Sequence, residues 1–119
     1  MSVPAPVAIR LRTRSRLLEV SFADGTSFEL PAEYLRVHSP SAEVKGHGID
    51  TGVLVTGKER VGISAVEPVG HYAVRLLFDD GHDTGLFTWK YLYELGSQRE
   101  TRWLIYLKRL EKAGIGRTT

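Results

Sequence analysis

The residues best suited to chemistry cluster in one short run, Asp79-Asp80-Gly81-His82-Asp83. Carboxylate oxygens and an imidazole nitrogen suit hard and borderline cations, and a hairpin tip can bring several of them to one point. The pair Asp80-Gly81 is also a pair that tight hairpin turns favour, so a polar turn in solvent explains the same residues without a ligand. The run therefore predicts either a metal site or an ordinary hairpin tip, and the turn is the simpler interpretation.

Two further histidines, His38 and His47, lie in a glycine-rich stretch between residues 37 and 60. They would meet His82 only if this stretch folds back over the hairpin that carries His82. Strong zinc signatures show paired ligands at short fixed intervals, which this spacing lacks. Metal binding through His38, His47, His82 and Asp83 is therefore an alternative, with zinc or iron as the ion and with His82 and His38 as its first candidate ligands.

Arginine-rich segments near both ends carry a third chemical signal. The N-terminal arginines fall at every second position, and alternate residues of a strand share one face. These residues are Arg10, Arg12, Arg14 and Arg16, and the C-terminal basic residues are Arg99, Arg102, Lys108, Arg109 and Lys112. A turn around Thr13-Arg14-Ser15 would break the stripe. Because the net charge is only +2 and no recognised motif is present, weak nucleic-acid binding is the less favoured alternative.

Composition excludes several kinds of active site. The chain contains no cysteine, which rules out thiolate zinc ligation, iron–sulfur ligation and a cysteine nucleophile. It also lacks a Gly-x-Ser-x-Gly elbow, a phosphate-binding glycine loop and a His-Glu-x-x-His zinc motif. We therefore expect a protein that is not an enzyme.

Two hairpins, each followed by a helix, are expected to position these residues. In the first, strands 17–22 and 27–30 flank a type I′ turn at Asp24-Gly25, and a helix covers 31–36. In the second, strands 72–78 and 84–87 flank Asp80-Gly81, and Thr88 caps a helix over 89–95. Further strands are expected at 10–12 and 61–66. An amphipathic helix of about 14 residues should end near Gly114.

Length and composition predict one soluble α+β domain. The chain has 119 residues, of which 42% are hydrophobic and 25% charged. We expect a single domain over residues 1–119, with an ordered core at 9–113 and short flexible termini. Its antiparallel sheet should have five or six strands, covered by two short helices and the C-terminal helix. No apolar run approaches the ~18 residues of a membrane span, so a cytoplasmic location is expected.

Several blocks of the sequence agree in order and spacing with one known family. The blocks are 30–43, 46–48, 66–74 and 78–85, followed by Trp89 and Tyr91-Leu92. They resemble the gamma-butyrobetaine-hydroxylase-like N-terminal domain family, a domain of unknown function, over residues 9–113. The resemblance implies that, in the carnitine-pathway hydroxylases, this domain precedes a separate catalytic domain that depends on iron and 2-oxoglutarate. That catalytic domain is expected to be absent here.

The same resemblance implies a small zinc module with three cysteines and one histidine. By position, these four ligands fall at Ser39, Ser41, Val44 and His82. Serine hydroxyls are poor zinc ligands and valine has no donor, so a zinc site of the family's kind should be absent. His82 is then expected either to form a structural hydrogen bond or to join His38 or Asp83 in a rearranged site.

We therefore favour a non-enzymatic accessory or interaction domain with no cofactor. The resemblance extends to a segment attached to some P-loop iron–sulfur carrier proteins. The expected partner is consequently a protein, with an iron-dependent oxygenase or an iron–sulfur carrier system as the candidates, and neither a membrane nor nucleic acid is favoured. The expected docking surface contains His38, Ser39, Ser41, His47, Asp80, His82 and Asp83.

Overall fold

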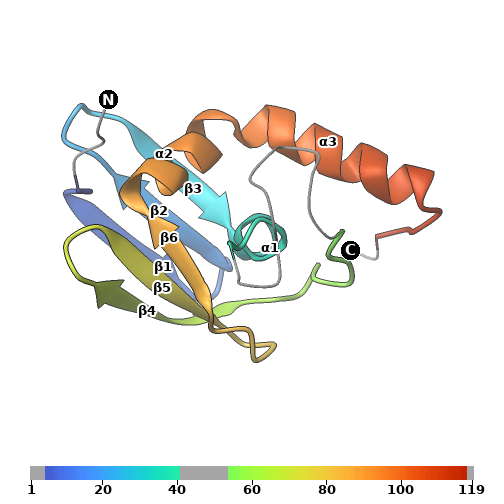
Figure 1. Ribbon diagram of the computed structural model, residues 1–119, viewed down its shortest axis with the longest axis horizontal. Coiled ribbons are helices and arrows are strands. Elements are labelled where there is room, and N and C mark those ends of the chain that lie inside the picture. Colours follow the sequence, from blue (N-terminus) through green and yellow to red (C-terminus); the bar gives the residue numbers. More distant parts are fainter. Residues whose placement is uncertain (1–4, 41–53, 118–119) are drawn as a thin grey trace.

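The computed structural model describes residues 5–40 and 54–117 and has the expected α+β class (Figure 1). Its elements are β1 (Ala8–Arg12), β2 (Leu17–Ser21), β3 (Ser27–Pro31), α1 (Ala32–Val37), β4 (Ile63–Val69), β5 (Ala73–Phe78), β6 (Gly85–Thr88), α2 (Trp89–Ser97) and α3 (Arg99–Lys112). The six antiparallel strands form two three-stranded sheets, β1-β2-β3 and β4-β5-β6. The expected hairpins, the two short helices and the C-terminal helix are all confirmed.

The core lies where the inner faces of the two sheets meet α1 and α2. Alternate residues of the central strands are buried, such as Leu18 and Val20 on β2 and Val74 and Leu76 on β5. This is the period-two pattern of a sheet with one buried face. Figure 1 shows α2 following β6 and lying beside β3, and α3 extending away from both sheets.

The first hairpin closes through a loop of a different type from the one expected. Gly25 N–H donates to Phe22 O at 3.1 Å, and Phe22 N–H donates to Thr26 O at 2.8 Å. A type I′ turn needs a positive φ at both central residues, but here Gly25 (φ +88°) has one and Asp24 does not. The extra residue Ala23 makes the loop three residues long, so the expected type I′ turn is wrong.

The second hairpin repeats this geometry. Gly81 (φ +92°) donates to Phe78 O at 3.2 Å, and Phe78 N–H donates to His82 O at 2.9 Å. In each loop the aspartate before the glycine accepts a hydrogen bond from a backbone N–H two residues later. Thr26 N–H donates to Asp24 Oδ1 at 2.9 Å, and His82 N–H donates to Asp80 Oδ1 at 3.1 Å. The repetition noticed in the sequence therefore extends to the hydrogen bonds of both loops.

Two tyrosines cross-link the helices that follow these hairpins. Tyr34 of α1 donates its hydroxyl to Leu95 O of α2 at 2.6 Å, and Tyr91 of α2 donates its hydroxyl to His38 O after α1. His38 follows Tyr34 by one helical turn, and Leu95 follows Tyr91 by the same distance in the sequence. The two units are thus joined by a reciprocal pair of bonds, as in an approximate twofold arrangement.

Replacing either tyrosine by phenylalanine should destabilise the protein by a similar amount. Tyr34→Phe and Tyr91→Phe each leave a carbonyl at the end of a helix without its hydroxyl donor, at a cost of about 1–2 kcal/mol. Chemical denaturation measures this cost, with Tyr72→Phe as the control because the Tyr72 side chain is exposed. A full loss for one tyrosine and none for the other would refute the reciprocal arrangement.

The ends of α2 and α3 follow their capping residues. Thr88 Oγ1 accepts from Tyr91 N–H at 3.1 Å, which confirms the expected cap of α2. Gly114 (φ +72°) ends α3, and Ile115 N–H donates to Leu110 O at 2.9 Å. In the part of the chain that the structure describes, no helix has both the length and the apolar character needed to cross a membrane.

Candidate functional site

The tip of the β5–β6 hairpin lies against the end of α1. Ser39 Oγ is 2.9 Å from His82 Nε2, so these two predicted site residues are brought together from distant parts of the chain. Asp80 and Asp83 lie at the same tip, and His38 lies beside Ser39 in the sequence. Ser41 and His47, the other predicted members, and Val44 fall outside the described residues.

Asp80 joins three segments of the fold. Its Oδ2 accepts from Arg36 Nε of α1 at 2.9 Å and from Lys58 Nζ at 2.6 Å, while its Oδ1 accepts from His82 N–H at 3.1 Å. Burial alone would raise the pKa of Asp80, but Lys58, the His82 N–H and Arg36 together lower it to about 2. Asp80 is therefore a charged structural link, and its carboxylate is already occupied by two cations.

Asp80→Asn should destabilise the protein by about 1–2 kcal/mol near neutral pH, a value discounted for the partial exposure of both ion pairs. The native pKa of Asp80 lies below its unfolded value, so its contribution is complete above about pH 4 and is lost as the pH falls through about 2. Urea unfolding at neutral and acidic pH measures this difference. Asp83→Asn, at the exposed neighbouring carboxylate, is the control, and an equal loss there would contradict the assignment.

The Ser39–His82 pair is enclosed by the hairpin. Ser39 is only 7% exposed, and a side chain added at Gly85 would overlap Ser39 Oγ and lie 3.1 Å from Phe87 Cε1. A serine bonded to a histidine suits nucleophilic catalysis only if a substrate can reach the hydroxyl. The burial of Ser39 favours the structural hydrogen bond that the sequence offered as one role for His82.

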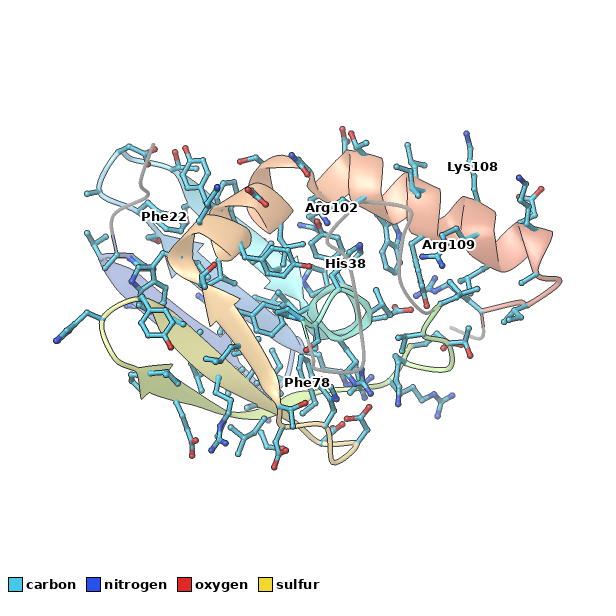
Figure 2. The ribbon with its side chains drawn as sticks, viewed as in Figure 1. Phe22, His38, Phe78, Arg102, Lys108 and Arg109 are labelled. Carbon is cyan, nitrogen blue, oxygen red and sulfur yellow. The ribbon has the colours of Figure 1, made fainter. Side chains whose placement is uncertain are left out.

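A hydrogen bond to the backbone fixes the tautomer of the His38 ring. Its Nδ1 donates to Tyr34 O at 2.9 Å, because a carbonyl oxygen can only accept. Its pKa is lowered to about 4, mainly by burial and to a smaller extent by the charges of Arg102 and Arg109, while the bond to Tyr34 acts in the opposite direction. Figure 2 shows His38 between α1 and the start of α3, next to Arg102. The side chain is therefore neutral at physiological pH.

The described residues do not assemble the alternative metal site. Within residues 5–40 and 54–117, no three His, Asp or Glu side chains are grouped so as to hold one ion. Asp80, the best placed carboxylate, is paired with Arg36 and Lys58. Sequence reasoning missed both of these cations, since Arg36 is 44 residues away from Asp80 and no local pattern links them.

A turn interrupts the row of N-terminal arginines, which is the outcome expected if residues 13–15 form a turn. Arg10 and Arg12 lie on β1, opposite Glu19 and Leu17 of β2, and Arg12 forms an ion pair with Glu19. Arg16 lies in the turn after β1, where its φ is +54°. On α3, Arg102 is 5% exposed and bonds to Gln98, so it is not available to a phosphate backbone. These contacts give no support to nucleic-acid binding.

Comparison with known proteins settles the family. A family model described as gamma-butyrobetaine hydroxylase-like, N-terminal, matches residues 9–93, which include both hairpins and most of α2. The chain belongs to this family. The resemblance seen in the sequence is confirmed, although the match ends before α3 and is shorter than the expected residues 9–113.

Solved structures agree with this family assignment. Two NMR solution structures are each 52% identical to this chain with a TM-score of 0.84, and the alignments cover 98% of this chain and 86% or 91% of theirs. A crystal structure from Acidithiobacillus ferrooxidans, of a protein with unknown function in the DUF971 family, is 48% identical with a TM-score of 0.64. That alignment covers 76% of this chain and 91% of the other. No curated protein matches the chain.

Proposed function

We propose that this member of the gamma-butyrobetaine hydroxylase-like N-terminal family is a non-enzymatic interaction domain that docks a protein partner. The docking surface, called the tip surface here, comprises Asp80, His82 and Asp83 together with the largely buried His38 and Ser39 that support them, and the prediction extends it to Ser41 and His47. The proposal rests on one observation: the chemical groups of the tip surface are already bonded within the protein. Asp80 pairs with two cations, and His82 bonds to Ser39.

A surface of this kind is rigid before it meets a partner. The Asp80 contacts tie the hairpin tip to α1 and to the segment around Lys58, so docking would order few additional side chains. Asp79 and Asp83 remain exposed on either side of Asp80. Two exposed carboxylates on a rigid tip fit a basic patch on the partner.

Charge reversal tests this proposal on the partners that the family resemblance implies. A purified iron–sulfur carrier protein and an iron-dependent oxygenase domain are each titrated into isotope-labelled protein. We expect backbone amide shifts centred on the tip surface for one of them, and about tenfold weaker binding for Asp79→Lys with Asp83→Lys. Glu111→Lys on α3 is the control. Shifts away from the tip, or binding unaffected by the reversal, would refute the docking surface.

Metal binding remains the second candidate, because the structure brings Ser39 next to His82 Nε2. The resemblance implies that these positions hold a cysteine and the histidine of a zinc module in the family, so a hydroxyl would stand here where a thiolate binds there. Zinc or iron would then need His82 together with His38 or Asp83. The titration described at the end of the Discussion separates this candidate from the docking proposal.

A further inference from the structure

A groove of about 580 Å³ lies between α1 and α3. Its walls include Pro31, Glu33, Tyr34, Glu100, Trp103 and Arg117. The Tyr34 and Trp103 rings meet edge to face with their centroids 6.3 Å apart. The groove therefore combines an aromatic wall with a carboxylate, Glu33, whose side chain is only 10% exposed.

The chain's own Arg117 already shows which chemistry this groove accepts. Arg117 Nε donates to Glu33 Oε2 at 3.0 Å, and its terminal nitrogen Nη2 bonds to Glu33 Oε1. Its guanidinium carbon lies 5.1 Å from the centre of the Trp103 ring. Two parallel bonds to a carboxylate and an aromatic face are the contacts that select a guanidinium over an ammonium group.

Arg117 lies on the segment that follows α3, called the tail here, and two glycines in this segment allow it to move. The tail begins where Gly114 ends α3, and a further glycine, Gly116, precedes Arg117. A second hollow of about 320 Å³, lined by Leu110, Ile115 and Arg117 among others, adjoins the tail. Departure of Arg117 would remove the two-bonded cationic partner of the buried Glu33 carboxylate, which favours entry of another guanidinium.

We propose that the groove between α1 and α3 is a recognition site for an arginine side chain of a partner protein, and that Arg117 occupies it as an internal competitor. The site differs from the tip surface in using Glu33 and the helix that lies beyond the family match at residues 9–93, although the Tyr34 ring in its wall also packs on His38, with ring centres 4.7 Å apart. Displacement of the tail exchanges one guanidinium for another at Glu33.

Binding of an arginine tripeptide to an Arg117→Ala variant tests the proposal. The probe is acetyl-Gly-Arg-Gly-amide, and the readout is the Trp103 indole N–H signal in NMR. We expect saturable shifts in Arg117→Ala, binding at least about tenfold weaker in the wild-type protein, and loss of binding when Glu33→Gln is added. Arg10→Ala, which removes an exposed arginine on β1, should bind like the wild type.

Three controls keep the proposal falsifiable. The citrulline tripeptide, with the same shape and no charge, should not bind, and free L-arginine should bind more weakly than the peptide. In the wild-type protein, a high concentration of the probe should move the Arg117 Nε–H signal, which tests the site even if Arg117→Ala does not fold. Equal binding of citrulline, tighter binding of free arginine, binding unaffected by Glu33→Gln or an unmoved Arg117 signal would each overturn the proposal.

Discussion

Gly96→Ala should destabilise the protein by roughly 2–3 kcal/mol, although alanine is the better helix former by about 1 kcal/mol. Gly96 lies in α2, and a Cβ at this position would be 2.6 Å from Phe28 Cδ1 and closer still to two other ring carbons. Phe28 cannot turn aside easily, because its ring packs edge to face against Phe22 at 6.1 Å and Tyr93 at 5.5 Å. The clash therefore outweighs helix propensity.

Chemical denaturation of two further variants isolates this cause. Gly116→Ala is the matched control, since a Cβ there meets no atom within 4 Å, and it should change stability by less than about 0.5 kcal/mol. In a Phe28→Ala background, Gly96→Ala should become neutral or stabilising because the ring has been removed. A neutral Gly96→Ala with Phe28 in place would show that β3 and α2 are not in close contact.

The protein should lose roughly 3 kcal/mol of stability between pH 7 and pH 4 because of His38. Burial lowers the native pKa of His38 to about 4 from its ordinary value near 6.5. The unfolded chain therefore binds a proton over this interval and the native chain does not. The stability contributed by neutral His38 is complete above about pH 6.5 and is lost as the pH falls through about 4.

His38→Gln tests this assignment, because glutamine can still donate to Tyr34 O and does not titrate in this range. Unfolding free energies measured from pH 7 to pH 4 should fall steeply for the wild type and remain much flatter for the variant. Asp80 adds its own loss only below about pH 4, so the two contributions separate. Parallel curves for wild type and variant would show that His38 is solvated.

The hairpins and helices could be predicted because their signals are local. Asp-Gly pairs, alternating apolar residues, Thr88 and Gly114 act through neighbours in the sequence. Two features could not be predicted, since they depend on how distant segments pack: the division into two sheets, and the reciprocal bonds of Tyr34 and Tyr91. The turn type was wrong because the Asp-Gly pair does not specify the length of the loop.

The candidate site was predictable only in part, for the same reason. The family resemblance implied that positions 39 and 82 meet, and the structure places Ser39 Oγ 2.9 Å from His82 Nε2. The roles of Arg36 and Lys58 at Asp80, and of Arg117 at Glu33, come from ion pairs between distant segments. Charged residues occur throughout the chain, so no pattern in the sequence indicates which of them pair.

We infer that His38, Asp80 and His82 of the tip surface act as structural contacts and not as metal ligands. A backbone amide NMR spectrum of metal-stripped protein, titrated with zinc and then anaerobically with ferrous iron, tests it most directly. Ser39→Cys with Ser41→Cys and Val44→Cys, which restores the cysteines that the resemblance implies, provides a positive control for zinc. We predict a folded spectrum without saturable shifts in the wild-type protein. Saturable shifts confined to residues around His38 and His82 would contradict the account and assign a metal to this site.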